Sequence, residues 1–189
     1  MRQRLAPLVD FFCDPGIDRA YGRFPEGQVR SMLSAYYGQI TLLDAQIGRV
    51  MASLDASGRR ENTMIVFTSD HGDYLGNNWP FYRYGAPYDS LSRMPFILSW
   101  PGRVESGTRR HALTSLIDLA PTFLQAAGAT PVDPVDGVPL QPLLEGGDHD
   151  WREDLFVGDG NVQALITPEW RYVRWNDGFE ALQPPARSP

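Results

Sequence analysis

The sequence predicts an α/β fold, in which helices flank a sheet of mainly parallel strands. Three observations favour this class. One long segment, 29–56, has apolar residues at every third or fourth position, as on one face of a helix. Two short runs, 63–68 and 95–100, are apolar and rich in branched or aromatic side chains, as in strands buried on both faces. Helices and strands also alternate along the chain, which is typical of the class.

The composition excludes several classes of protein. The chain has 189 residues and a formal net charge of -6, which disfavours nucleic acid as a partner. Its single cysteine, Cys13, excludes an internal disulfide framework and any multi-cysteine zinc site. No apolar run approaches the ~20 residues of a membrane-spanning helix. All 17 basic residues are arginine, so lysine takes no part in any site of this chain.

The elements follow in order from an irregular start. Residues 1–28 contain proline and glycine at intervals that interrupt any regular element. The helix predicted for 29–56 ends where Gly58 supplies a left-handed residue. A polar turn then leads into the first strand, 63–68.

A long loop separates the two predicted strands. The first strand ends in the turn Ser69-Asp70-His71-Gly72, and the second occupies 95–100. The 21 residues between them, 73–93, are rich in Asn, Tyr and Gly and show little periodicity. Structureless loops of that length inside compact domains are usually functional.

A third strand and a second helix are predicted after this pair. Residues 112–117 have the composition of a short strand. Asp118 then suits the N-cap of a helix that ends at Gly128. A Pro, Gly and Asp-rich surface segment follows at 131–150.

The end of the chain predicts the start of a small antiparallel sheet. Residues 161–166 and 170–175 have the pattern of a hairpin. We divide the chain into an irregular leading segment (1–28), part of an α/β domain (29–150) and an incomplete antiparallel subdomain (151–189). Because parallel sheets need several strands and two covered faces, we expect the chain to be part of a larger fold.

Asp70 and His71 directly follow the first predicted strand. In open α/β sheets, ligands bind at the carboxyl ends of the strands. A carboxylate beside an imidazole offers an oxygen and a nitrogen to a divalent cation, or a base with its orienting partner. Gly72 lets the backbone turn sharply at that point. The residue types alone leave an alternative open, in which Asp70 forms an Asx-turn that caps the next element.

Several segments, taken in order, closely resemble the sulfatase family of the alkaline phosphatase superfamily. The resemblance covers roughly residues 33–175 and rests on the ordered set, because no single segment is specific. The segments are Tyr36-Tyr37-Gly38-Gln39-Ile40, Leu43-Asp44-Ala45-Gln46-Ile47-Gly48-Arg49-Val50, Asn62-Thr63-Met64-Ile65-Val66-Phe67-Thr68-Ser69-Asp70-His71-Gly72-Asp73-Tyr74-Leu75-Gly76, Arg93-Met94-Pro95-Phe96, Trp100-Pro101-Gly102 and Asp118-Leu119-Ala120-Pro121-Thr122.

This resemblance implies a metal site and a sulfate site. It implies that Asp70 and His71 are two ligands of a calcium or magnesium ion. It implies a sulfate contact at Arg83, where the family usually has a lysine; arginine keeps the charge and offers a planar fork to a tetrahedral oxyanion. Tyr82 is expected to line the substrate pocket, as is Asn78, although the family often has an aspartate and a histidine at this point.

The nucleophile that the resemblance implies is expected outside this chain. In the family it is a cysteine or serine in the signature Cys/Ser-x-Pro-x-Arg, which is oxidised to formylglycine. The segment Cys13-Asp14-Pro15-Gly16-Ile17 has the proline but lacks the arginine, and it lies too close to the long helix. We therefore interpret Cys13 as an ordinary cysteine and expect the formylglycine in a missing N-terminal half.

The expected function is that of a sulfatase-like hydrolase, present here as a C-terminal half cut short at both ends and inactive alone. The expected substrate is a small-molecule or carbohydrate sulfate ester, and a separate chain supplying the N-terminal half is a candidate partner. Two alternatives remain: a phosphodiester or phosphonate monoester hydrolase of the same superfamily, and a non-catalytic remnant. His111 and His149 are expected on a solvated basic edge and in an acidic loop, outside any site.

Overall fold

The computed structural model describes residues 26–75, 88–131, 133–147, 151–158 and 160–184. The chain divides into two compact units, one of residues 1–56 with 73–84 and one of residues 57–72 with 85–189. Each unit is described by itself. The combination of helices and strands confirms the predicted α/β class. No helix in the described ranges has the length and hydropathy to cross a membrane.

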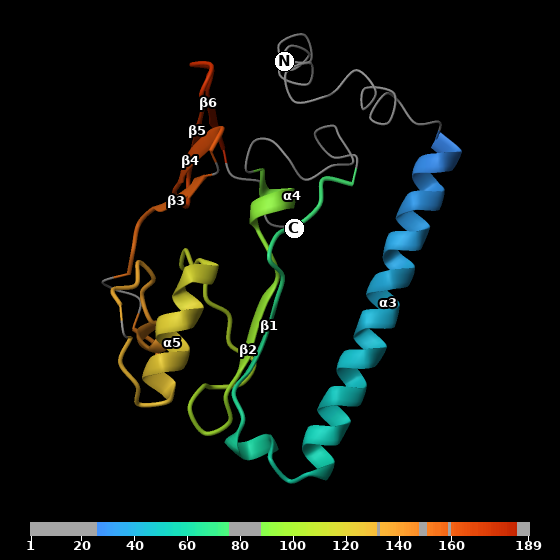
Figure 1. The fold of residues 1–189 in the computed structure, drawn as a ribbon, viewed down its shortest axis with the longest axis vertical. Coiled ribbons are helices and arrows are strands. Elements are labelled where there is room, and N and C mark those ends of the chain that lie inside the picture. The colour runs from blue at the N-terminus through green and yellow to red at the C-terminus, as the bar shows by residue number, and fades with distance from the viewer. Residues whose placement is uncertain (1–25, 76–87, 132, 148–150, 159, 185–189) are drawn as a thin grey trace. The chain divides into compact units, whose positions relative to one another are not determined.

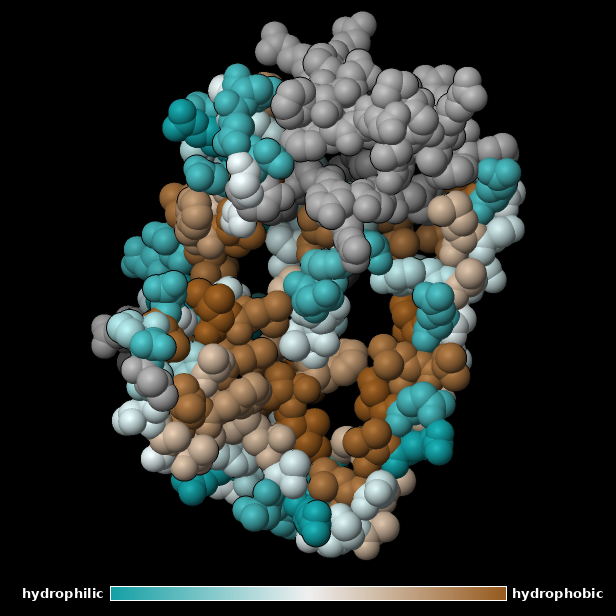
Figure 2. Space-filling model, in the orientation of Figure 1, coloured by the Kyte–Doolittle hydropathy of each residue, from teal (hydrophilic) through white to brown (hydrophobic). Residues whose placement is uncertain are grey.

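The first unit contains one long helix, α3, which spans Glu26–Ala56 (Figure 1). It begins three residues before the predicted start, where Glu26 pairs with Arg30 one turn later at 2.9 Å. Gly58 has a φ of 67°, which confirms the left-handed stop. No residue of α3 is buried, and Leu43 and Val50 are among its exposed hydrophobic side chains. Hydrophobic surface is visible along this helix in Figure 2. The predicted helix therefore carries exposed apolar residues, and no element among the described residues of this unit covers them.

The second unit begins with a two-stranded sheet. Strand β1 (Ile65–Thr68) pairs with β2 (Phe96–Ser99) in antiparallel register, with Ile65 opposite Ser99 and Thr68 opposite Phe96. The prediction that both runs lie in a parallel sheet, buried on both faces, is therefore wrong in this structure. β1 is half-buried, and Ile97 of β2 is 62% exposed. No third strand joins this sheet within the described ranges.

Residues 112–117 do not form the predicted strand. The segment leads instead into a short 3-10 helix, η2 (Leu116–Asp118), and then α5 (Leu119–Ala126). The side chains and backbones of Ser115 and Asp118 form a reciprocal capping box. Gly128 has a φ of 66° and ends α5 as predicted. The described part of the unit contains three further short helices: η1 (Arg60–Asn62), α4 (Asp89–Ser92) and α6 (Gln141–Leu144).

The end of the chain forms a four-stranded antiparallel sheet in which each strand pairs with the next along the chain (Figure 1). Its strands are β3 (Leu155–Gly158), β4 (Val162–Ile166), β5 (Arg171–Trp175) and β6 (Glu180–Gln183). The predicted hairpin is confirmed as β4 and β5, and β3 and β6 extend it on either side. Alternate residues point to opposite faces, so Ala164 and Val173 are buried while Leu165 and Tyr172 are exposed.

Candidate metal site at the end of β1

Asp70 and His71 lie in the turn that follows β1, and their side chains point toward each other. His71 Nε2 lies 3.6 Å from Asp70 Oδ2. The Asp70 side chain is 82% exposed and that of His71 35%. The end of the strand thus presents one carboxylate and one imidazole together on an accessible surface.

Hydrogen bonds around Asp70 hold the carboxylate in its ionised form. The backbone N–H of His71 donates to Asp70 Oδ1 at 2.9 Å, and the Ser69 hydroxyl lies 3.3 Å from the same oxygen. The His71 N–H holds the pKa of Asp70 below its ordinary value, and the His71 ring adds to this lowering whenever the ring is protonated. A metal ligand must be deprotonated, and this environment favours that state.

The same contacts weigh against the alternative of a simple cap. An Asx-turn would take the N–H two residues on, that of Gly72, whereas Asp70 accepts from His71. Neither a helix nor a strand begins between Asp70 and Leu75 that the carboxylate would cap.

The imidazole of His71 is oriented by the backbone. Its Nδ1 lies 2.8 Å from the carbonyl oxygen of Gly72, a distance at which a protonated Nδ1 donates to that oxygen. In that tautomer Nε2 carries the lone pair, and Nε2 is the atom nearer Asp70 Oδ2. A backbone carbonyl that fixes the second ring nitrogen is the usual arrangement for histidine metal ligands.

The spacing of the two donor atoms fits one hard cation. Ca²⁺ binds its ligands at about 2.3–2.6 Å, so two ligands at right angles lie about 3.4 Å apart. The 3.6 Å between Asp70 Oδ2 and His71 Nε2 is close to this value. The corresponding spacing for Mg²⁺ is about 2.9 Å, which is shorter. The described residues contain no group of three or more His, Cys, Asp or Glu side chains, so the pair is at most part of a coordination shell.

Gly72 anchors this turn to α4. Its N–H donates to the carbonyl oxygen of Leu91 at 2.8 Å. A Cβ at this position would lie 2.0 Å from the backbone oxygen of Ser90, so only glycine fits without a shift of the backbone. Asp89, the first residue of α4, forms an ion pair with Arg171 of β5. The turn with the two candidate ligands is therefore connected through α4 to the four-stranded sheet.

The remaining predicted site residues are distributed as follows. Arg83, Tyr82 and Asn78 lie outside the described residues, as do Cys13 and His149. His111 is exposed, in agreement with its predicted place on a solvated edge. The structure thus brings together Asp70 and His71, which the sequence pattern also singled out as neighbours.

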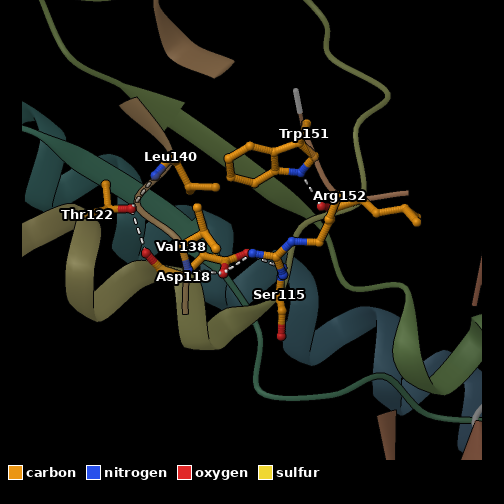
Figure 3. A network of polar contacts seen from close by, with 8 residues as sticks. Ser115, Asp118, Thr122, Val138, Leu140, Trp151 and Arg152 are labelled. Atoms are coloured by element: carbon orange, nitrogen blue, oxygen red, sulfur yellow. Dashed lines mark hydrogen bonds and ion pairs between the residues drawn. The ribbon is translucent and has the colours of Figure 1, made fainter. Parts of the chain in front are cut away.

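A buried polar network around Asp118 was not anticipated (Figure 3). Asp118 is fully buried and accepts from the N–H groups of Ser115 and Val138, at 2.8 and 2.9 Å, and from Arg152 Nη2 at 2.6 Å. Its side chain does not cap α5, contrary to the sequence interpretation. The Thr122 hydroxyl donates to the Asp118 carbonyl at 2.5 Å and accepts from the N–H of Leu140. This network joins separate chain segments and its carboxylate is fully buried, so we assign Asp118 to structure.

The comparisons with known proteins agree on one family. The family model for sulfatases matches residues 9–129. An arylsulfatase of Clostridium perfringens is 38% identical over 74% of this chain and 30% of its own length. A phosphonate monoester hydrolase from Silicibacter pomeroyi superposes with a TM-score of 0.75 at 30% identity, over 82% of this chain and 35% of its own. A protein solved with its substrate D-glucosamine-2-N,6-O-disulfate gives a TM-score of 0.71 at 28% identity, over 77% and 32%.

The chain spans about a third or less of the length of these relatives. The match to the family model nevertheless includes more than half of the chain, together with the strand end that carries Asp70 and His71. This chain belongs to the sulfatase family.

Proposed function

We propose that this chain supplies part of the metal and substrate site of a sulfuric ester hydrolase. The observation that carries the proposal is the pairing of Asp70 Oδ2 and His71 Nε2 at 3.6 Å on the exposed end of β1, within a member of the sulfatase family. Asp70 and His71 would hold one divalent cation, Ca²⁺ or Mg²⁺. When bound, this ion would act as a Lewis acid that polarises the transferring group.

Three residues of the long loop complete the proposal. Arg83 would contact the sulfate group and stabilise its negative charge with a planar guanidinium. It would not donate a proton to the leaving alcohol, because its pKa is too high. Tyr82 and Asn78 would contact the rest of the substrate. These assignments are carried by the sequence resemblance, since the three residues lie outside the described ranges.

The chain as given would perform the binding part of the reaction. The segment Ser99-Trp100-Pro101-Gly102-Arg103 has the form Ser-x-Pro-x-Arg, but Ser99 is the last residue of β2 and pairs with Ile65 of β1. The formylglycine nucleophile would therefore come from sequence that aligns with the remaining part of the relatives. With only two ligands from this chain, the affinity for the metal should be weak, because a cation such as Ca²⁺ takes six to eight ligand atoms. A sulfated carbohydrate is the favoured substrate, because one relative is an N-acetylglucosamine-6-O-sulfatase and another was solved with a disulfated glucosamine.

A phosphonate monoester hydrolase is the second candidate. It is favoured by the superposition on the Silicibacter pomeroyi enzyme and by 35% identity to a multifunctional alkaline phosphatase superfamily protein of Trinickia caryophylli. A tetrahedral oxyanion held by the same kind of metal pair would serve either reaction. The two candidates differ in the preferred ester and can be separated by kcat/KM.

The decisive experiment removes the carboxylate of the proposed metal site in a relative that contains the whole fold. In the Clostridium perfringens arylsulfatase, the residue that aligns with Asp70 is replaced by alanine. We expect loss of bound calcium and a fall in kcat/KM for 4-nitrophenyl sulfate of more than about 100-fold, since even residues that only orient a ligand cost 10- to 100-fold. The residue that aligns with the exposed Asp133 serves as the control.

Unchanged calcium content and activity in that variant would refute the metal role of Asp70. For the chain itself, calorimetry with CaCl₂ should give weak binding that Asp70→Asn abolishes. The preferred ester is measured with the unmodified relative. A higher kcat/KM for a phosphonate monoester than for the sulfate ester would favour the phosphonate monoester hydrolase.

A further inference from the structure

A groove of about 1,020 Å³ lies on the second unit, and neither Asp70 nor His71 lines it. One wall is the segment that precedes η2, with Arg109, Arg110 and His111. The other wall comes from the four-stranded sheet and the turn before β5, with Trp170 and Tyr172, and Trp151 also lines the groove. Its volume is at the upper end of the roughly 300–1,000 Å³ of small-molecule sites, so it can hold more than one sugar ring.

The arginine wall offers positive charge to an anion. Arg110 donates through Nε to the carbonyl oxygen of Leu143 at 3.2 Å, so this contact positions the guanidinium without neutralising it. Arg109 and His111 are exposed beside it. Arg152 also lines the groove, but the buried carboxylate of Asp118 compensates its charge. Among the described residues, Arg109 and Arg110 are therefore the lining arginines that form no ion pair, and Glu153 and Glu169 are the carboxylates in the same lining.

The opposite wall offers flat apolar surface. Tyr172 stands opposite Leu165 on β4 and Leu182 on β6, and Phe156 continues this row across β3. The four side chains are between 38% and 68% exposed, and Trp170 at the end of the turn is 50% exposed. A hydrogen bond with the Glu180 side chain raises the pKa of the Tyr172 hydroxyl, which favours its neutral form. Such a row can stack on the C–H face of a pyranose ring.

The groove is separate from the candidate metal site. Successive residues of a strand point to opposite faces, so Arg171 and Tyr172 face opposite sides of β5. Arg171 forms its ion pair with Asp89 of α4, the helix that contacts Gly72, whereas Tyr172 faces the groove. A ligand in the groove would therefore be held by the other face of the sheet.

We propose that this groove binds a sulfated oligosaccharide at a distance from the reacting ester. Arg109 and Arg110 bind sulfate groups, and Trp170 and Tyr172 stack on the sugar rings between them. Glu153 and Glu169, which also line the groove, accept hydrogen bonds from sugar hydroxyls. The choice of sulfate over other anions rests on the proposed function, while the pairing of arginines with aromatic rings comes from the groove itself.

The test is a titration of the full chain with a size-defined heparin tetrasaccharide, followed by calorimetry and by NMR of the arginine and tryptophan side chains. The fully desulfated tetrasaccharide is the matched ligand. We expect Arg109→Gln to weaken binding of the sulfated ligand about tenfold or more, because it removes a charge-assisted hydrogen bond. Trp170→Leu keeps an apolar side chain without the flat ring and should also weaken binding. Arg59→Gln, which removes an exposed arginine elsewhere, should leave the affinity unchanged.

Equal binding of the sulfated and desulfated ligands, or equal losses in Arg109→Gln and Arg59→Gln, would overturn the inference. So would the absence of binding by the unmodified chain. Asp70→Asn separates this inference from the proposed function. We expect Asp70→Asn to bind the tetrasaccharide as the unmodified chain does. If Asp70→Asn loses binding while Arg109→Gln binds normally, the saccharide lies at the end of β1 and the groove is not its binding site.

Discussion

Asp118 joins three stretches of chain through one buried carboxylate. Its oxygens accept from the backbones of Ser115 and Val138 and from Arg152, and its side chain is fully buried. Removing one partner of a buried pair leaves the other partner charged and without compensation, which costs more than the pair itself contributes.

Asp118→Ala should therefore lower the free energy of unfolding of the second unit by about 3–5 kcal/mol. Urea denaturation followed by tryptophan fluorescence would measure this, because Trp151 lies next to Arg152 in the network. Asp133→Ala removes an exposed carboxylate and should change stability by less than about 0.5 kcal/mol. Similar losses in both variants would show that the network does not stabilise the unit.

At the scale of single residues, the sequence located the candidate ligands but not this network. Asp70 and His71 are neighbours in the chain, so their proximity follows from local geometry and a family pattern. The partners of Asp118 lie up to 34 residues away. The local sequence is the same for an aspartate that caps the following helix and for one that accepts hydrogen bonds from Val138 and Arg152, because in both cases the aspartate precedes an apolar helix.

The connection from β1 to α4 depends on close backbone contact at Gly72. A methyl group there would meet the Ser90 carbonyl, and the bond from the Gly72 N–H to Leu91 would have to lengthen. Gly72→Ala should lower the stability of the second unit by about 1–3 kcal/mol, the usual cost of overpacking. It should also raise the hydrogen-exchange rate of the Gly72 amide.

Gly160→Ala is the matched control for this change. Gly160 lies in the same unit, a Cβ added to it would have no atom within 4 Å, and it does not need a positive φ. The substitution should be neutral or stabilise by about 0.4–1 kcal/mol through the unfolded state. The role given to Gly72 fails if the two variants have the same stability and the same exchange rates.

At the scale of elements, periodicity predicted α3, α5 and the β4–β5 hairpin, whose signals are local. Strand direction was predicted wrongly, because an apolar run such as 63–68 contains no information on the direction of its partner. The connection from β1 to β2 is long enough for either direction. Residues 112–117 have strand composition, yet the Leu113 carbonyl accepts from Trp151 Nε1 and Ser115 N–H donates to Asp118. Side-chain hydrogen bonds, one of them from Trp151, therefore take the place of a strand partner in this segment.

At the scale of the whole molecule, the exposed apolar side chains have a measurable consequence. No residue of α3 is buried, and Leu43 and Val50 are 54% and 67% exposed. Apolar surface of this kind binds hydrophobic dyes and promotes association. We expect the isolated chain to bind such a dye and to self-associate, and both effects should decrease in the double variant Leu43→Gln with Val50→Gln.

Dye fluorescence and sedimentation velocity measure these effects, and circular dichroism checks that α3 remains helical. Ser53→Gln, a polar change on the same helix, is the control. A monomeric chain with no dye binding would show that the apolar residues of α3 are covered in solution. The helix α3 was predicted correctly, and among the described residues no element covers its apolar side chains. The chain spans about a third or less of the length of its relatives, so most of the residues that could pack on this helix in them have no counterpart here.

The turn between β4 and β5 has a consequence for how this sequence can vary. Thr167 and Trp170 close it through reciprocal backbone and hydroxyl bonds, so that Ile166 faces Arg171 across the hairpin. Inserting or deleting one residue here would shift the register of β5 by one residue and move each of its side chains to the opposite face of the sheet, unless a β-bulge accommodated the change. Arg171 would then turn away from Asp89, and Tyr172 would enter the core. Natural variants should therefore conserve the length of this turn.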